Sequence, residues 1–226
     1  MINLDELPMR VAQGQMTSPN DDDLRFIKQT GCDDFQLNLV KSPETGDGFW
    51  ALDYLKSLVA KADEHQMRLI TIENVPFTFH DDILTNGPRR EEQLKNMILT
   101  IGNMGKAGIP ILGYHFMPTC VWRTSREEPG PRGALGTSFN FDRLDGIRDY
   151  SAMSMPDAFK TDRDIDDDEM WENYDWFMER ILPVCEEAGV RLALHPDDPP
   201  TEHPLGGVAR IFRNFENFKR AMDTYN

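Results

Sequence analysis

The hydrophobic and polar positions along the chain follow two periods, one typical of strands and the other of helices. Short runs of strand-type residues predict strands at five places: Met9–Gln13, Asp34–Val40, Arg68–Asn74, Ile109–Phe116 and Arg191–His195. Between these runs, apolar residues recur every three or four positions and predict helices. A strand followed by a helix, repeated five times, indicates an α/β fold whose parallel sheet has right-handed crossovers.

The predicted helices have apolar faces and recognisable ends. Asn20 can cap the first helix, which has an acidic first turn and ends at Gly31. Asn214 can cap the last helix, and Pro183 is expected to kink the one before it. The residues expected to mark the helical faces are Leu52, Leu55, Val59 and Ala62; Leu94, Met97, Ile98, Ile101 and Met104; Tyr174, Phe177, Met178, Ile181, Cys185 and Ala188; and Phe215, Phe218 and Met222.

Ionisable residues at the ends of three predicted strands favour one α/β architecture over another. Glu73, His115 and His195 each stand at a carboxyl end, one to three residues before a proline. In an eight-fold barrel these ends converge on one mouth, whereas in a doubly wound open sheet they spread along an edge. A glycine-rich dinucleotide turn does not follow the first strand. We therefore expect a single domain over residues 1–226 of the (β/α)8 TIM-barrel type, incomplete at about five βα units, because a whole barrel takes about 250 residues.

Residues 119–167 are too long a stretch for an ordinary connection after the fourth strand. The segment is rich in Gly, Pro, Arg and Asp, and it opens with Trp122 and Arg123. An insertion on the catalytic face predicts a lid over the substrate, and its arginines could bind a carboxylate in bidentate fashion. The alternative is a solvated loop without specific chemistry. The arginines concerned are Arg123, Arg126, Arg132, Arg143 and Arg148.

Composition narrows the possible partners. With 24 basic and 39 acidic residues the net charge is −15, which argues against nucleic acid and anionic membranes but leaves a small anionic substrate open. The sequence has neither an apolar run of membrane-spanning length nor the pattern of a signal peptide. The three cysteines are scattered through the chain, which fits reduced thiols and predicts a cytoplasmic protein.

The run Arg191–Pro200 carries the clearest chemical signal. A strand delivers His195 into a stiff loop that holds Asp197 and Asp198 between prolines. An imidazole is a divalent-metal ligand, and nearby carboxylates can orient it from a second shell. The alternative is a hydrogen-bonded histidine in a surface loop.

Three motifs in order resemble those of the mannonate dehydratase family, a metal-dependent family with a TIM-barrel fold. His195–Pro200 with the Leu205–Gly206 turn and Arg210–Ile211 is similar to one stretch of that family. Tyr114–Pro118 with Trp122–Thr124 resembles its Tyr-Asn-Phe-Met-Pro and Trp-x-Arg-Thr signature, and Glu73–Pro76 resembles its Glu-Ser-Val-Pro. The resemblance covers essentially the whole chain and about the first two-thirds of the family's length.

The resemblance implies a lyase of hexuronate (glucuronate) catabolism that dehydrates D-mannonate to 2-keto-3-deoxy-D-gluconate with Mn²⁺ or Fe²⁺. A divalent ion would stabilise the charge that develops when a proton leaves the carbon beside the carboxylate. Of the family's metal ligands, only the histidine matches a residue of this chain, His195. The resemblance implies that the other ligands, and the main catalytic acid and base, lie beyond Asn226. Asp197 and Asp198 would then support the ligand. Residues expected to bind substrate are Glu73, His115, Trp122, Arg123 and Arg210.

Departures from the family pattern keep alternatives open. The family's asparagine at the fourth strand is His115 here, and Val121 replaces the acid before the tryptophan. A related barrel isomerase or epimerase of sugars, and a non-catalytic truncated fragment, are the competing interpretations. We expect the outer strands to be raw edges that leave Leu37, Ile70 and Leu192 partly uncovered. Such edges predict that the chain is poorly stable in isolation. We expect it either to form a homo-oligomer or to associate with a complementing C-terminal chain.

Overall fold

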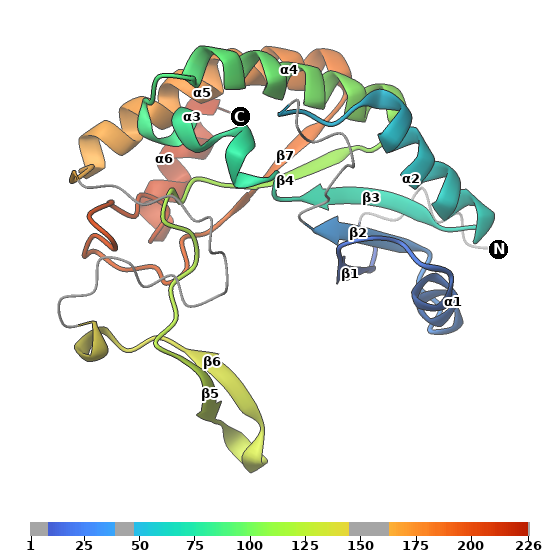
Figure 1. The fold of residues 1–226 in the computed structure, drawn as a ribbon, viewed down its shortest axis with the longest axis horizontal. Helices are drawn as coiled ribbons and strands as arrows, with labels where there is room; N and C mark the ends of the chain where they lie inside the picture. Colours follow the sequence, from blue (N-terminus) through green and yellow to red (C-terminus); the bar gives the residue numbers. More distant parts are fainter. Residues whose placement is uncertain (1–8, 39–47, 145–162, 226) are drawn as a thin grey trace. The chain divides into compact units, whose positions relative to one another are not determined.

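The computed structural model describes residues 9–38, 48–144 and 163–225. These residues form an α/β fold with an open, five-stranded parallel sheet (Figure 1). The strands are β1 (Ala12–Met16), β2 (Asp34–Asn38), β3 (Arg68–Glu73), β4 (Ile111–His115) and β7 (Arg191–His195), in the order β1-β2-β3-β4-β7. Pairs β1–β2, β2–β3 and β3–β4 are parallel. β1 and β7 are the two edges, so the predicted parallel α/β sheet is confirmed, and it is not closed into a barrel within the described residues.

Helices occur at all five places where the sequence predicts them, and a short helix that was not predicted, α3 (Asp81–Thr85), lies between the second and third of these. They are α1 (Asp21–Gln29), α2 (Leu52–Glu64), α3 (Asp81–Thr85), α4 (Arg90–Ala107), α5 (Asp167–Ala188) and α6 (Phe215–Tyr225), with a 3-10 turn η3 at Phe77–Phe79. The Asn20 carboxamide oxygen accepts a hydrogen bond from the Asp23 N–H at 2.9 Å, as expected of an N-cap. Gly31, at φ +84°, follows α1 and lies in the left-handed region that ends helices. Pro183 lies inside α5.

Several expectations from the sequence were wrong in detail. The first strand runs over Ala12–Met16 rather than Met9–Gln13, because pairing with β2 starts at Ala12 while Met9 and Val11 are exposed. Leu58, not Val59, is the buried residue on the α2 face. Leu37 is fully buried rather than partly uncovered, because it lies in β2, which is paired on both sides. Phe215 and Met222, expected on a helical face, are exposed. The last two positions of the second predicted strand, 39 and 40, lie outside the described residues.

The segment predicted as a lid contains an antiparallel hairpin that the sequence pattern did not indicate. The hairpin consists of β5 (Ser125–Pro129) and β6 (Leu135–Ser138), with 3-10 turns η4 (Pro131–Gly133) and η5 (Phe141–Arg143) beside it. In Figure 1 the hairpin projects away from the segments that directly precede and follow it in the chain. Residues 145–162, including Arg148, lie outside the described residues, so the lid function stays a prediction.

The chain divides into two compact units, each with its own core. Unit 1 comprises the described residues of Met1–Phe79, Gln93–Tyr114 and Ile181–Ala193; unit 2 comprises those of His80–Glu92, His115–Arg180 and Leu194–Asn226. In unit 1, Phe35, Trp50 and Ile72 are fully buried. In unit 2, the Tyr174 ring lies 4.9 Å from that of Phe212 and 5.2 Å from that of Phe116, centroid to centroid.

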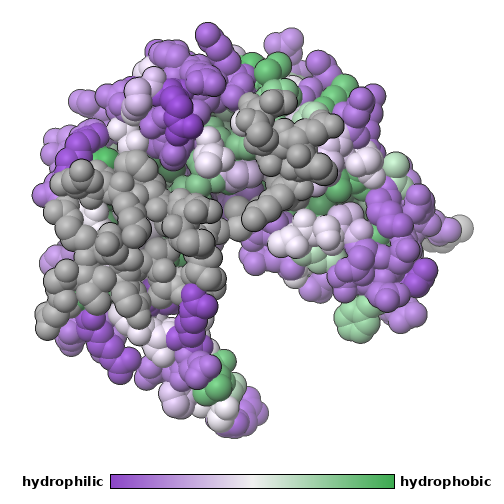
Figure 2. All heavy atoms as spheres, in the orientation of Figure 1, coloured by the Kyte–Doolittle hydropathy of each residue, from purple (hydrophilic) through white to green (hydrophobic). Residues whose placement is uncertain are grey.

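On the face shown in Figure 2, hydrophilic residues cover most of the described surface, and hydrophobic residues form small separate groups. The most exposed large apolar side chains are Met9, Val11, Phe215, Phe26, Leu135 and Met222. Single exposed apolar residues of this kind are normal for a folded chain. Among the described helices, the length and apolar character needed to cross a membrane are not found.

Candidate active site

β7 ends at His195, and the geometry of this ring fits a metal ligand. Nδ1 of His195 lies 2.6 Å from the carbonyl oxygen of Pro196, so Nδ1–H donates to this oxygen and Nε2 keeps its lone pair. The ring is half-buried. Metal-bound histidines commonly have one ring nitrogen on a backbone carbonyl and the other on the ion. Nε2 of His195 is therefore the nitrogen that can hold a divalent cation.

The loop after β7 contains a buried ion pair between Asp197 and Arg210, each only 2% exposed. Nη1 of Arg210 lies 3.7 Å from Oδ1 of Asp197, which is longer than a hydrogen bond. The other carboxylate oxygen, Oδ2, accepts from the Phe212 N–H at 2.5 Å. Burial raises the pKa of the Asp197 carboxyl to about 6, although the Arg210 charge and the Phe212 amide act in the opposite direction.

Arg210 also connects this loop to the segment that follows β4. Its Nη2 donates to the carbonyl oxygen of Cys120 at 2.7 Å and to Oγ1 of Thr119 at 3.2 Å. Nε and Nη1 of Arg210, and Oδ1 of Asp197, are buried without a hydrogen-bond partner in the part of the chain that the structure describes. Arg210 therefore holds two loops together with part of its hydrogen-bonding capacity unused.

Arg123 forms a second link between the same two segments. Its Nη1 donates to Oδ1 of Asp198 at 2.6 Å, its Nη2 donates to Oδ2, and its Nε donates to Oγ1 of Thr137 at 3.1 Å. The Trp122 N–H donates to the Asp198 carbonyl at 3.1 Å, and the Trp122 ring is 2% exposed. The start of the insertion is thus held against the loop of His195, with Trp122 inside unit 2.

His115, the last residue of β4, is 5% exposed and has a second histidine beside it. Its Nδ1 accepts from the Met117 N–H at 3.3 Å, which assigns the proton of the neutral ring to Nε2. The ring of His80, also 5% exposed, lies 5.3 Å away at 62°. Burial, together with the electrostatic influence of His80, His195 and Arg210, lowers the pKa of His115 well below its ordinary value.

Glu73, the last residue of β3, belongs to unit 1. Its Oε2 accepts from Nε2 of Gln36 at 2.9 Å and from Nε2 of Gln15 at 3.3 Å. Gln36 lies in β2, the neighbour of β3, and Gln15 lies in β1, the next strand of the sheet. Side-chain amides from two strands thus donate to one carboxylate. That Glu73 lines a cleft with the residues of unit 2 stays a prediction.

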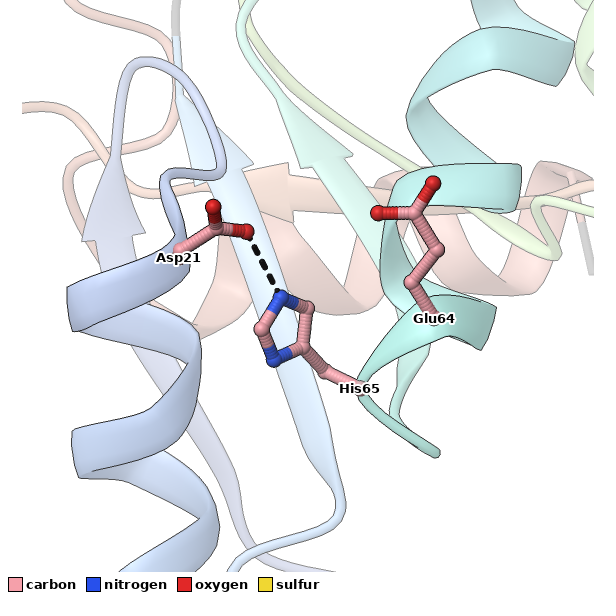
Figure 3. A group of neighbouring side chains, drawn as sticks. All are labelled: Asp21, Glu64 and His65. Atoms are coloured by element: carbon pink, nitrogen blue, oxygen red, sulfur yellow. Dashed lines mark hydrogen bonds and ion pairs between the residues drawn. The ribbon is translucent and has the colours of Figure 1, made fainter.

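Asp21, Glu64 and His65 are the one group of possible metal ligands found close together in the described residues (Figure 3). Nε2 of His65 lies 2.8 Å from Oδ1 of Asp21. The Lys61 ammonium, however, lies 2.5 Å from Oδ1 of Asp21 and 3.0 Å from Oε2 of Glu64. Because Lys61 already supplies the positive charge, and its hydrogen bond is the main reason that the pKa of Asp21 falls to about 2, we assign this group to the contact between α1 and α2.

The structure brings some of the predicted site residues into direct contact. Arg123 pairs with Asp198 and Arg210 with Asp197, while His115 and His195 lie in the same unit. His80 was not predicted. It follows the buried turn Phe77–Phe79 in the connection after β3, and a strand-end connection of a parallel sheet was the only available signal.

Comparison with known proteins agrees with the motifs. The family described as D-mannonate dehydratase (UxuA) matches residues 17–226. A mannonate dehydratase of Streptococcus pneumoniae is 32% identical over 192 residues, which cover 78% of this chain and 51% of that protein. One from Thermotoga neapolitana is 29% identical over 195 residues, covering 76% and 53% respectively. The chain thus spans about half the length of the curated relatives it matches.

Solved structures extend the likeness to the fold. The crystal structure of mannonate dehydratase from Streptococcus suis matches with a TM-score of 0.76 and 27% identity, over 95% of this chain and 61% of that one. A 3-keto-D-glucoside 4-epimerase from E. coli matches with a TM-score of 0.52 and 13% identity, over 95% and 63%, and shares the fold alone. From the match over residues 17–226, the chain belongs to the D-mannonate dehydratase family.

Proposed function

We propose that the natural protein containing this chain is a hydro-lyase that dehydrates D-mannonate to 2-keto-3-deoxy-D-gluconate in hexuronate catabolism. The proposal rests on family membership and on the curated relatives, which carry the name mannonate dehydratase. The structural observation that supports it is His195, whose Nδ1–H is held by the Pro196 carbonyl and whose Nε2 is left for an ion. Family membership indicates a divalent metal, and we propose Mn²⁺ or Fe²⁺.

In this proposal the loop residues around His195 hold the ligand in place. Asp198 is fixed by Arg123, and Asp197 by the Phe212 amide, in the loop that directly follows the histidine. A bound divalent ion would supply charge stabilisation while a proton leaves the carbon next to the substrate carboxylate. Removing a supporting carboxylate of this kind costs about 10–100-fold in metal affinity.

Substrate contacts follow from the protonation of the described side chains. His115, neutral and protonated on Nε2, can donate a hydrogen bond to a hydroxyl or carboxylate oxygen. Glu73 can accept one from a hydroxyl, and Trp122 would help to exclude water. Arg123 and Arg210 were predicted to meet the carboxylate. Their bonds to Asp198 and to the Thr119–Cys120 backbone favour a role in holding the loops, with substrate contact requiring release of those partners.

The test is the product formed by the full natural protein that contains these residues. Incubated with D-mannonate and Mn²⁺ or Fe²⁺, it should form the 2-keto-3-deoxy acid, observed by NMR of the reaction mixture. A sugar isomer as product would instead support the isomerase or epimerase alternative. Lack of any reaction with either metal would support a non-catalytic protein.

Metal binding can be tested separately from turnover. His195→Ala in the natural protein should lower Mn²⁺ affinity strongly in titration calorimetry, whereas His65→Ala, in the Asp21 group, should leave it unchanged. Equal affinity in the His195→Ala protein would remove the metal assignment. For the 226-residue chain alone we expect no tight stoichiometric site, because one histidine cannot enclose an ion.

We propose a small sugar-acid substrate and either a homo-oligomer or association with the remaining part of the barrel as the assembled state. Cys32, Cys120 and Cys185 form no disulfide within the described residues, and we propose a cytoplasmic location. Cell fractionation with a tagged natural protein would test it.

A further inference from the structure

The carboxyl ends of β2 and β3 in unit 1 carry two polar side chains that lie next to each other. Asn38 is the last residue of β2 that the structure describes, Glu73 is the last residue of β3, and the two are partners in register. Register partners point to the same face of a sheet, whereas the preceding pair, Leu37 and Ile72, is fully buried on the opposite face. Barrel folds place their substrate-binding groups at such strand ends.

Glu73 is held through one of its two carboxylate oxygens. Oε2 accepts from Nε2 of Gln36 at 2.9 Å and from Nε2 of Gln15 at 3.3 Å, and these are the hydrogen bonds that the side chain makes within the described residues. On the other side, the register partner of Glu73 in β4 is Gly113, where a Cβ would lie 3.0 Å from Cγ of Glu73. The carboxylate is therefore restrained on two sides, and Oε1 remains as an acceptor.

Asn38 is held in a complementary way. Its Oδ1 accepts from Nδ2 of Asn74 at 3.3 Å, and the Asn74 N–H donates to the carbonyl oxygen of Gly113 at 2.8 Å. Within the part of the chain that the structure describes, this is the side-chain hydrogen bond of Asn38, so the N–H groups of its Nδ2 remain as donors. The strand ends thus present a donor, Nδ2 of Asn38, beside an acceptor, Oε1 of Glu73.

A donor beside an acceptor matches the chemistry of neighbouring hydroxyl groups. A hydroxyl both donates and accepts hydrogen bonds, so two of them on adjacent carbons can bind to the two side chains at once. The charge of Glu73 disfavours a carboxylate at this place, and the N–H groups of Asn38 disfavour a cation. Asn38 and Glu73 therefore select the uncharged hydroxyl part of a ligand.

We propose that Asn38 and Glu73 form a subsite for two neighbouring hydroxyl groups of the sugar-acid chain. Asn38 donates to one hydroxyl through Nδ2, and Glu73 accepts from the other through Oε1. Gln15, Gln36 and Asn74 are positioning residues, because they hold these two side chains without touching the substrate. The identity of the substrate rests on the proposed function, whereas the hydrogen bonds that hold Glu73 do not.

Steady-state kinetics of the natural protein with D-mannonate tests the subsite. Asn38→Ala should raise KM by about 3–10-fold, the equivalent of one neutral hydrogen bond, and Glu73→Gln by about 10–100-fold, because a bond to a charged group is stronger. In both variants kcat should stay within about twofold, as expected of contacts made equally in the ground state and the transition state. A fall in kcat at constant KM, or an unchanged KM, would contradict the subsite.

Variants of two glutamines separate positioning from a general effect on the sheet. Gln36→Met removes the closer of the two amides that hold Glu73 and should raise KM by about 3–10-fold. Gln13→Met is the matched control, because the amide of Gln13, in β1, donates to the adjacent Gly14 carbonyl and not to Glu73. Equal KM values in the two variants would contradict positioning by Gln36.

Analogues of D-mannonate that each lack one hydroxyl, measured as competing ligands, make the test specific. The loss of affinity in Asn38→Ala should fall below about twofold for one analogue. The loss in Glu73→Gln should be smallest for the analogue that lacks the hydroxyl on an adjacent carbon. Losses of the same size for D-mannonate and for every analogue would overturn the contact with two hydroxyls.

Amide NMR of the metal-free natural protein without substrate tests how Glu73 is held. With ¹⁵N-labelled glutamine, Glu73→Met should shift the side-chain amide signals of Gln36 and speed their exchange with water, and it should leave those of Gln13 unchanged. Unchanged Gln36 signals would overturn the positioning role. A natural protein inactive on sugar acids would remove the substrate contact together with the proposed function, and the amide signals would still decide whether Gln36 holds Glu73.

Discussion

Two buried aspartates, one in each unit, are paired with arginine in different ways. Asp34, at the start of β2 in unit 1, is 1% exposed and accepts hydrogen bonds from Nε and Nη2 of Arg10 at 2.5 and 3.0 Å and from Nε of Arg68 at 2.9 Å. Asp197 in unit 2 is as buried, but Arg210 stays 3.7 Å away and one carboxylate oxygen has no hydrogen-bond partner in the described residues.

The pKa values of the two carboxyl groups move in opposite directions. Burial would raise the pKa of Asp34, but the hydrogen bonds from Arg10 and Arg68 outweigh it and lower the value. At Asp197 burial prevails and the pKa rises to about 6. Satisfied pairs of the first kind stabilise a fold, while under-satisfied pairs of the second kind are typical of functional sites. Their placement fits, because Asp34 begins a strand and Asp197 follows the end of one.

The largest effect is expected when the unit 2 pair is broken. Arg210→Met leaves the Asp197 charge buried without its counter-ion, and removal of one partner of a buried pair costs about 3–5 kcal/mol in the free energy of unfolding. Because the Asp197 pKa is about 6, the cost should be smaller at pH 5.5 than at pH 8, where the carboxylate must stay charged. Urea unfolding at the two pH values measures this.

The double variant Arg210→Met with Asp197→Leu is the control for this loss. Replacement of both charges by apolar residues is often close to neutral, so most of the lost stability should return. A double variant as unstable as the single one would mean that Arg210 stabilises through the Thr119 and Cys120 contacts, and not through the pair.

Breaking the unit 1 pair should cost less at neutral pH. Asp34→Asn removes charge from hydrogen bonds that are each worth about 1.5–3 kcal/mol, but leaves both arginines partly exposed to water. The wild-type contribution is present above the ordinary Asp pKa and is lost as the pH falls through the lowered value. Denaturant melts from pH 7 to pH 3 should show this loss in wild type and not in Asp34→Asn. Asp33→Asn, whose partner Lys28 is solvent-exposed, should change stability by less than about 1 kcal/mol.

His115 gives a pH dependence that is specific to unit 2. Its pKa is lowered, so protonation favours the unfolded chain; the stability is complete above the ordinary value of about 6.5 and falls by about 1.4 kcal/mol for each pH unit below it. His115→Asn should remove this slope between pH 6.5 and 5.5, while His203→Asn should keep it. An unchanged slope in His115→Asn would mean that another group of unit 2 carries the dependence.

The order of strands and helices was predictable because it depends on local periods and end signals. Asn20 and Asn214 cap helices through side chains within three residues of the bonded N–H, so the sequence alone contains the signal. The hairpin was not predicted, since Ser125–Pro129 and Leu135–Ser138 are mostly polar or small and do not alternate. The misplaced first strand has the opposite cause: Met9 and Val11 alternate well but lie outside the pairing with β2.

The candidate site was predictable only in part. His195 follows from a strand that ends at a proline, which is a local pattern. The partners of Arg123 and Arg210 lie 75 and 91 residues away along the chain, at Asp198 and Thr119, and arise from tertiary packing. For His80 the only sequence signal is its place in the connection after β3, and burial and the neighbouring ring are what distinguish it from other histidines.

The smallest change in the free energy of unfolding is expected at the helix caps. Replacing them tests whether the two units differ only in their buried charges. The Asn20 side chain caps α1 in unit 1, and the Asn214 side chain caps α6 in unit 2, each accepting an N–H at 2.9 Å. Both caps are exposed, so Asn→Ala at either position should cost about 1 kcal/mol, and Asn→Ser should recover most of it. Helical signal followed during urea unfolding measures both. Equal costs would confine the difference between the units to the buried carboxylates, whereas a much larger loss for Asn214→Ala would show that unit 2 is weaker throughout and that the effect of Arg210→Met does not report on the Asp197 pair alone.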